Sequence, residues 1–203
     1  MTGALQPVGK AVVAELAEHG AAAIFACSST VLSGSHAVFD DEMANLKADV
    51  AKQSPNTTVV PFPVDVTSEQ EILQLIDEIL NSYGRLDIWV ASSGLLGPSS
   101  VETTTPSDLQ KCFESNSLAP FLALKYAKPA MMKTAVKGSY GNAAPKDRPY
   151  GSIIVVTSVA STYGGRIHPS ASEHANKYRL LGSGTHHVIA CRFGGCPLWS
   201  ARP

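Results

Sequence analysis

Short apolar runs alternate with longer stretches of helical periodicity along this chain, and the alternation limits the folds that it can adopt. Each run is apolar on both of its faces, which is typical of strands that are covered by helices on both sides. Strands and helices in this order form a parallel sheet, and right-handed crossovers place helices over both of its faces. We therefore predict an α/β fold with a doubly wound parallel sheet. The predicted strands are 21–27, 57–65, 86–93 and 152–158, with a short further strand within 186–193.

The helices are predicted from apolar spacing and from residues that favour helix ends. Gly20 provides a stop for the first helix. Thr67 and Gln70 match a capping box at the start of a later one. Thr105 and Pro106 favour the start of the longest helix. The predicted helices span about 10–19, 41–53, 67–80 and 105–132.

The remaining segments show no helical or strand periodicity. Pro120 and Pro129 are expected to bend the longest helix. Residues 134–150 are rich in Gly, Pro, Lys and Asn, and they are predicted to form a surface insertion. Residues 178–203 form an atypical tail. A chain of 203 residues is long enough for one buried core, so residues 1–203 are assigned to a single domain.

Composition argues against several classes of partner. Sixteen basic and seventeen acidic residues give a net charge of −1, without the basic cluster that a nucleic-acid or anionic-membrane partner requires. Four scattered cysteines are expected to be free thiols in a reducing compartment. The pair His186 and His187 lacks further ligands for a metal. No stretch is long and apolar enough for a membrane span, so we expect a cytoplasmic protein.

Glycines lie directly before the first predicted helix, in Thr2-Gly3-Ala4 and at Gly9. Such glycines let the backbone approach a pyrophosphate, and the helix N-terminus adds free N–H groups and the positive end of the helix dipole. By itself, a glycine-containing helix start is more often only a turn.

Taken in order, these segments resemble the short-chain dehydrogenase/reductase family. That family has a Thr-Gly-x-x-x-Gly-x-Gly turn, of which Gly3 and Gly9 are present while Pro7 replaces the middle glycine. The strand that ends in Ala-Ser-Ser-Gly at Gly94 is similar to the one before the family's Asn-Asn-Ala-Gly turn. The strand around Ser158 is similar to the one that carries the family's catalytic serine. The resemblance implies a Rossmann-type fold and hydride transfer between an alcohol and a ketone with NADP or NAD.

The resemblance also assigns residues to the cofactor. Asp65 falls at the family's adenine-contacting Asp, although from the residues alone it can equally cap the next helix. Lys125 falls where related sequences often carry a basic residue, although taken alone it is a solvated lysine. Strand 21–27 ends in Cys-Ser-Ser without an acidic residue for a ribose 2′-OH, which favours NADP slightly. The implied cofactor contacts are Gly3, Val8, Gly9, Asp65, Ala91, Gly94, Lys125 and Lys177.

Two residues match the family's catalytic machinery directly. Ser158 falls at the serine whose hydroxyl hydrogen-bonds the substrate oxygen, and it follows a buried strand, where active sites of open α/β sheets lie. Asn116 falls at the asparagine that helps to organise a proton-relay water. Without the resemblance, Ser158 is a turn residue and Asn116 a neutral polar residue within a helix.

The family's Tyr-x-x-x-Lys acid/base motif is altered in this chain. With Lys177 as the lysine, Glu173 occupies the position of the tyrosine; with His174 in the place of the lysine, that position is Ser170. A carboxyl group with an ordinary pKa is poorly matched to the protonation of an alkoxide. Tyr163 and Tyr178 lie nearby, but their spacing from Ser158 and Lys177 excludes them as the acid/base tyrosine.

The resemblance covers Thr2 to Lys177, and both ends differ from the family. The family has an apolar strand before the Thr-Gly turn and a substrate lid after the lysine, so we expect a missing first strand, unpaired strand edges and a truncated C-terminal part. Three functions remain open: an oxidoreductase acting on a small alcohol or ketone, an inactive relic that binds nucleotide weakly or pairs with an intact relative, and a non-functional fragment. A homo-oligomer is a further expectation from the resemblance.

Overall fold

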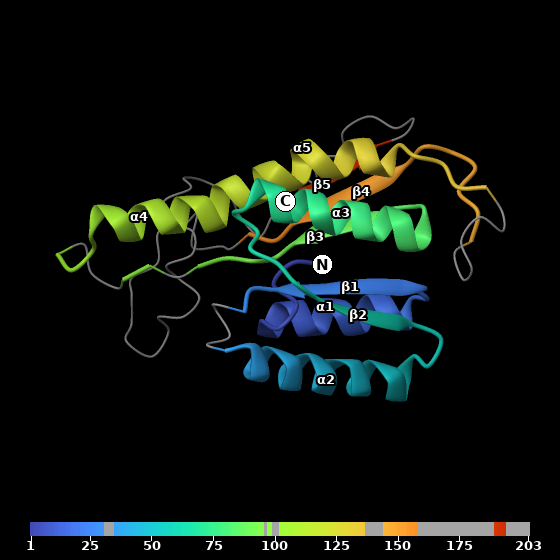
Figure 1. Cartoon of the computed structure of the whole chain (residues 1–203), viewed down its shortest axis with the longest axis horizontal. Helices are drawn as coiled ribbons and strands as arrows, with labels where there is room; N and C mark the ends of the chain where they lie inside the picture. Colours follow the sequence, from blue (N-terminus) through green and yellow to red (C-terminus); the bar gives the residue numbers. More distant parts are fainter. Residues whose placement is uncertain (31–34, 96, 99–101, 137–143, 158–188, 194–203) are drawn as a thin grey trace, which may run out of the picture.

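The computed structural model describes residues 1–30, 35–95, 97–98, 102–136, 144–157 and 189–193, and Figure 1 shows how their elements are arranged. The elements in chain order are α1 (Pro7–Glu18), β1 (Ala23–Ser28), α2 (His36–Gln53), β2 (Thr58–Pro63), α3 (Glu69–Tyr83), β3 (Ile88–Ala91), α4 (Pro106–Phe113), the π-helical turn η1 (Glu114–Leu118), α5 (Ala119–Met131), β4 (Gly151–Val155) and β5 (Ile189–Phe193).

Parallel pairing joins β1 to β2 and β3 to β4, and β5 lies antiparallel to β4. Thr2 connects the two ladders, since it forms parallel bridges with both Cys27 and Ala91. The resulting order is β2, β1, Thr2, β3, β4 and β5. This order confirms the predicted parallel sheet, to which β5 adds an antiparallel strand in the segment where a short strand was expected.

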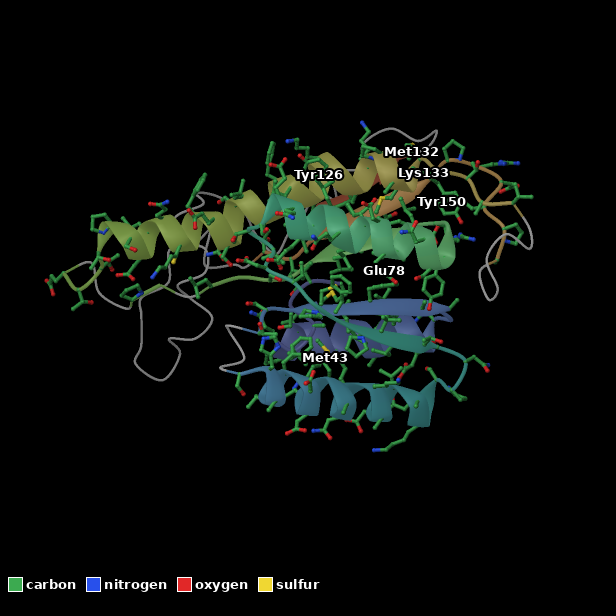
Figure 2. The ribbon with its side chains drawn as sticks, in the orientation of Figure 1. Met43, Glu78, Tyr126, Met132, Lys133 and Tyr150 are labelled. Carbon is green, nitrogen blue, oxygen red and sulfur yellow. The ribbon has the colours of Figure 1, made fainter. Side chains whose placement is uncertain are left out.

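Helices cover both faces of the sheet. Successive side chains of a strand point to opposite faces, so one strand can pack against helices on both sides. Ile24 and Ala26 of β1 pack with α1 and α2 in one apolar cluster. Phe25 and Cys27 pack with α3 and α5 in another. Figure 1 shows the two helix pairs on opposite sides of the strands, and Met43 of α2 lies within its cluster in Figure 2. The predicted doubly wound arrangement is therefore confirmed.

Two helices begin earlier than their apolar spacing predicts. α1 begins at Pro7 rather than Lys10, because proline has no N–H to leave unsatisfied in a first turn and its φ already suits a helix. α2 begins at His36, where the Ser35 Oγ accepts a hydrogen bond from the Val38 N–H at 3.3 Å. A proline at the first helical position sets one boundary and a serine cap sets the other, rather than the apolar stripe.

The capping box predicted at Thr67 and Gln70 is wrong by one residue. Ser68 is the N-cap of α3, and its Oγ accepts a hydrogen bond from the Glu71 N–H at 3.4 Å. The Glu71 carboxylate in turn accepts one from the Asp65 N–H at 2.7 Å. Thr67 instead donates to the Asp65 carboxylate and so closes the turn before the helix.

The longest helix begins as predicted, with a reciprocal capping box between Thr105 and Asp108. It is then divided by η1, where the Ala119 N–H bonds to the Glu114 carbonyl. Pro120 follows directly, and it has no N–H to continue the α-helical pattern of hydrogen bonds. The interruption expected at this proline therefore takes the form of a π-helical turn.

Residues 134–150 are not entirely the surface insertion that their composition predicts. Lys146 is only 1% exposed. Its Nζ donates hydrogen bonds to the carbonyl oxygens of Leu86 and Met131, both at 2.8 Å, and lies 3.3 Å from the Asp87 carboxylate. A buried lysine is tolerated when acceptors surround its ammonium group, and this one ties the segment to the end of α5 and the start of β3.

None of the helices within the described ranges is long and apolar enough to cross a bilayer. The same residues contain no group of three His, Cys, Asp or Glu side chains that could hold a metal ion.

Candidate functional site

The chain turns sharply between Thr2 and α1, at the carboxyl ends of β1 and β3. The Thr2 N–H donates to the Val90 carbonyl at 2.9 Å, and the Ala4 N–H donates to the Cys27 carbonyl at 3.0 Å. These bonds anchor the turn to both strands. In open α/β sheets, ligands bind outside the carboxyl ends of the strands, at the point where the strand order reverses. The turn lies at such a point, because β1 leads toward β2 and β3 leads toward β4.

Both predicted glycines of this turn are required by its packing. Gly3 has a φ of 70°, which side-chain-bearing residues rarely adopt. A Cβ on Gly3 would lie 2.8 Å from the Ser93 nitrogen, and a Cβ on Gly9 would lie 1.9 Å from the Gly3 carbonyl oxygen. The backbone of the turn is therefore pressed between α1 and the loop that follows β3.

The first turn of α1 presents backbone donors. Pro7 occupies its first position and has no N–H, whereas the N–H groups of Val8 and Gly9 lie outside the helical hydrogen-bond pattern. Val8 is 45% exposed. No acidic residue lies in this first turn, so the positive end of the helix dipole is not neutralised there. These are the features of an anion-binding helix N-terminus.

Gln6 is a site residue that the sequence did not reveal. It is the N-cap of α1 but makes no capping hydrogen bond with its side chain. Its Nε2 instead donates to the Gly94 carbonyl at 3.1 Å. This contact joins the Gly3–Gly9 turn to the loop after β3, where Gly94 was predicted to contact the cofactor. Its only sequence signal is a glutamine where a shorter capping side chain is usual.

Asn116 holds the same loop from the other side. Its Oδ1 accepts a hydrogen bond from the Leu95 N–H at 2.8 Å, and its Nδ2 donates to the Leu95 carbonyl at 3.0 Å. The residue lies within η1, and π-helical turns often occur at functional sites. The structure therefore brings Asn116 next to the predicted site at Gly94; its part in a proton relay stays a prediction.

Asp65 lies in the exposed turn after β2. Its Oδ1 accepts hydrogen bonds from the Thr67 N–H at 2.9 Å and the Thr67 hydroxyl at 2.8 Å. These bonds support the alternative that Asp65 shapes the start of α3, and its contact with adenine stays a prediction. Ala91, also assigned to the cofactor, is buried at the end of β3 and is bridged to Thr2.

Lys125 is engaged elsewhere in this structure. Its Nζ lies 2.9 Å from the Glu69 carboxylate at the start of α3, and 4.7 Å from the centre of the Tyr126 ring. No described contact joins it to the Gly3–Gly9 turn or to Gly94. Its assignment to the cofactor therefore stays a prediction without geometric support.

The catalytic residues predicted beyond β4 lie outside the described residues; they are Ser158, Glu173 and Lys177. β4 itself leads toward the carboxyl edge of the sheet, and the Val156 N–H donates to the Ala91 carbonyl at 2.9 Å. The described chain thus reaches this edge beside Ala91, two residues before Ser158.

Comparison with known proteins gives relatives over most of the chain. The profile of the family described as short chain dehydrogenase matches residues 1–176. A hydroxynaphthalene reductase-like protein from Metarhizium majus is 29% identical over 127 residues, which cover 63% of this chain and 43% of the relative. Momilactone A synthase from Oryza sativa subsp. japonica is 30% identical over 171 residues, which cover 80% of this chain and 55% of the relative. The chain thus spans about half the length of these two relatives.

The fold has close counterparts among solved structures. Xylitol dehydrogenase bound to NAD⁺ superposes with a TM-score of 0.62 at 20% identity, over 89% of this chain and 58% of that chain. The profile match includes the Gly3–Gly9 turn, the strand before Gly94, Asn116 and Ser158. The chain therefore belongs to the short-chain dehydrogenase/reductase family.

Proposed function

We propose that the chain binds NADP or NAD at the Gly3–Gly9 turn and transfers a hydride between a small alcohol and a ketone. The observation that carries this proposal is the packing of the turn. Gly9 lies against Gly3, Gly3 lies against Ser93, and two free N–H groups of α1 are left at the carboxyl edge of the sheet. Membership of the family supports the same assignment, as does the NAD⁺ bound to xylitol dehydrogenase, which shares the fold.

The residues present fit the phosphate-bearing part of such a cofactor. The Val8 and Gly9 N–H groups would receive the pyrophosphate, with the helix dipole adding to the attraction. Pro7 removes one donor from the turn, so we expect weaker affinity than an all-glycine turn provides. β1 ends at Ser28 without a carboxylate, so no negative charge on this strand end opposes the 2′-phosphate of NADP. We therefore propose NADP as the preferred cofactor.

The bound nucleotide would supply or accept the hydride at its nicotinamide ring. In this proposal Ser158 donates a hydrogen bond to the substrate oxygen, Lys177 holds the ribose, and Glu173 occupies the place of the acid/base tyrosine. Asn116 positions the loop after β3 through its two bonds to Leu95. A carboxyl group is a weak match for alkoxide protonation, so we expect slow turnover.

A second candidate function follows from that same substitution. Without a tyrosine at position 173, the chain can bind nucleotide and yet leave the reaction uncatalysed. Such a protein would act as a nucleotide-binding relic.

The deciding experiment is titration of the purified chain with NADPH and then NADH, following nucleotide fluorescence and thermal unfolding together. Ligand that binds the native state must raise its apparent stability. Saturable binding, followed by turnover of a ketone panel that is lost in Ser158→Ala, is the result expected for the enzyme. Binding without turnover of any ketone or alcohol supports the relic. A cooperatively folded chain that binds neither nucleotide overturns both.

A further inference from the structure

The peptide group between Gly94 and Leu95 is held from two sides at the carboxyl edge of the sheet. Its carbonyl accepts a hydrogen bond from the Gln6 Nε2 at 3.1 Å, and its N–H donates one to the Asn116 Oδ1 at 2.8 Å. The carbonyl and the N–H belong to one rigid, planar unit. Movement of one end of this unit therefore moves the other.

The two side chains reach this peptide group from opposite layers of the fold. Gln6 directly precedes α1, which packs on one face of the sheet, and Asn116 lies in η1, directly before α5 on the other face. Figure 1 shows α1 and α5 on opposite sides of the strands. Along the chain, 88 residues separate Gln6 from Gly94. The contact is thus a tertiary link between the two layers and not part of a local turn.

The hydrogen bonds run in series from donor to acceptor. Gln6 donates to the peptide group, and the peptide group donates to Asn116. The Asn116 Nδ2 donates onward to the Leu95 carbonyl at 3.0 Å. Each bond in such a chain polarises the next and strengthens it. Loss of the Gln6 donor should therefore weaken the bond that Asn116 accepts.

Gln6 is placed for this contact and not for capping. An N-cap side chain ordinarily accepts hydrogen bonds from the first turn of its helix, whereas the Gln6 side chain makes no such bond and extends to Gly94 instead. The loop after β3 carries only serine and glycine at 92–94. The side-chain amides that hold its last peptide group therefore come from outside the loop, one from Gln6 and one from Asn116.

We propose that Gln6 is a positioning residue, which fixes Asn116 relative to the Gly3–Gly9 turn. It acts through the peptide group between Gly94 and Leu95, to which both side chains bond. The consequence for the reaction rests on the proposed binding of a nucleotide at that turn, whereas the link between Gln6 and Asn116 is present in the free chain. Through this link, a change at the turn is transmitted to the residue that is predicted to organise the proton relay.

The first test follows the nucleotide-free, isotope-labelled full chain by NMR. Gln6→Met keeps the length of the side chain and removes its amide. Gln6→Asn keeps an amide that is one methylene too short to reach Gly94, and it supplies a favoured N-cap, so this variant should fold at least as well as the unchanged chain. The readouts are the backbone N–H of Leu95 and the side-chain NH₂ of Asn116, whose signal is identified by its loss in Asn116→Asp.

We expect both Gln6 variants to shift these two signals upfield, as weaker hydrogen bonds do. Gln74→Met is the matched control, because it removes an amide from an exposed position of α3, and it should leave both signals in place. An effect confined to the packing of α1 would move signals of α1 and not these two. If the Leu95 and Asn116 signals keep their positions in Gln6→Asn, the proposal is wrong, whether or not Gln6→Met folds.

The second test measures NADPH affinity in the unchanged chain, in Gln6→Met, in Asn116→Asp and in the double variant. Substitutions that act through one shared group give non-additive effects. We expect the double variant to bind NADPH at least about twofold more tightly than the product of the two separate losses predicts. Additive losses would contradict the coupling. Gln74→Met should bind NADPH as the unchanged chain does.

The two tests separate this proposal from the proposed function. Binding of NADPH with additive losses leaves the nucleotide site in place and removes Gln6 as a positioning residue. If the unchanged chain binds neither NADPH nor NADH, the proposed function fails, and the NMR signals alone decide whether Gln6 positions Asn116.

Discussion

Gly9 and Gly3 are in such close contact that a methyl group on Gly9 would lie 1.9 Å from the Gly3 carbonyl oxygen. No side chain fits between them, so the first turn of α1 lies directly on the turn that precedes it. The direction of the Val8 and Gly9 N–H groups depends on this contact. Nucleotide affinity and the packing of the helix are therefore coupled at one pair of residues.

We predict that Gly9→Ala lowers the free energy of unfolding by about 1–3 kcal/mol, as overpacking does in a close-packed interior. It should also weaken NADPH binding at least tenfold. The control is Gly20→Ala, at a residue with a φ of 82° and no atom near its added Cβ. That variant should lose about 1–2 kcal/mol from backbone strain alone and keep its affinity. Urea denaturation and NADPH titration measure both effects, and equal loss of affinity in the two variants would argue against the coupling.

Pro7→Ala is predicted to strengthen NADPH binding several-fold, because it returns an N–H to the first turn of α1 without adding the flexibility of glycine. Pro61→Ala is the matched control, since that proline lies in β2 and away from the turn. Titration of both variants with NADPH gives the answer. Unchanged affinity in Pro7→Ala would mean that the missing donor is not directed at the nucleotide.

Asn116→Asp should lower the free energy of unfolding by about 1–3 kcal/mol, because the Leu95 carbonyl loses its donor and faces a carboxylate instead. The Leu95 N–H keeps its acceptor, so the variant isolates one of the two bonds. Asn45→Asp, on the exposed side of α2, should change stability by no more than about 0.5 kcal/mol. Denaturation curves at pH 7 give the free energies of unfolding of the two variants for comparison. A loss that is equally small in both would show that the Leu95 contact contributes little.

The strands and helices could be predicted from the sequence because each element carries its own pattern. Apolar runs such as 152–158 have no polar face, and α3 has a strong apolar stripe. Helix starts were less predictable: Ser35 and Ser68 set two of them through single hydrogen bonds. A hydroxyl near a helix start does not reveal which of several adjacent residues will cap it.

The candidate site was predictable where a residue type is itself the requirement. Gly3 needs a positive φ and Gly9 needs the absence of a side chain, so a glycine pattern identifies both. Gln6 and Lys146 were not predictable, because their partners lie far away in the chain, at Gly94 and Leu86. Only the folded structure brings those groups together.

Lys146→Met should lower the free energy of unfolding by about 2–4 kcal/mol. The aliphatic part of the side chain is retained, but the carbonyl groups of Leu86 and Met131 lose their donor, and each buried unsatisfied group costs about 1–3 kcal/mol. Lys133→Met makes the same chemical change at an exposed position and should stay within about 0.5 kcal/mol. Urea denaturation of both variants measures the two losses in free energy of unfolding. If Lys146→Met is as stable as its control, the desolvation of the buried ammonium must offset its hydrogen bonds.

The N-terminus should make stability depend on pH. Burial lowers the pKa of the Met1 amino group below its ordinary value of 8.0. In the window between the folded pKa and 8.0, the unfolded chain binds more protons than the folded chain, so stability must rise with pH across that window. Below the window the full cost of the buried charge is present.

We expect this rise in denaturation curves recorded at closely spaced pH values, in protein that retains Met1. N-terminal acetylation should abolish it, since the group then cannot titrate. Burial raises the pKa of the Cys27 thiol and of the Cys112 thiol above their ordinary value of 9.0, so stability should fall again at higher pH. Cys27→Ala should reduce this fall while leaving the rise. A rise that persists after acetylation would have to come from another group.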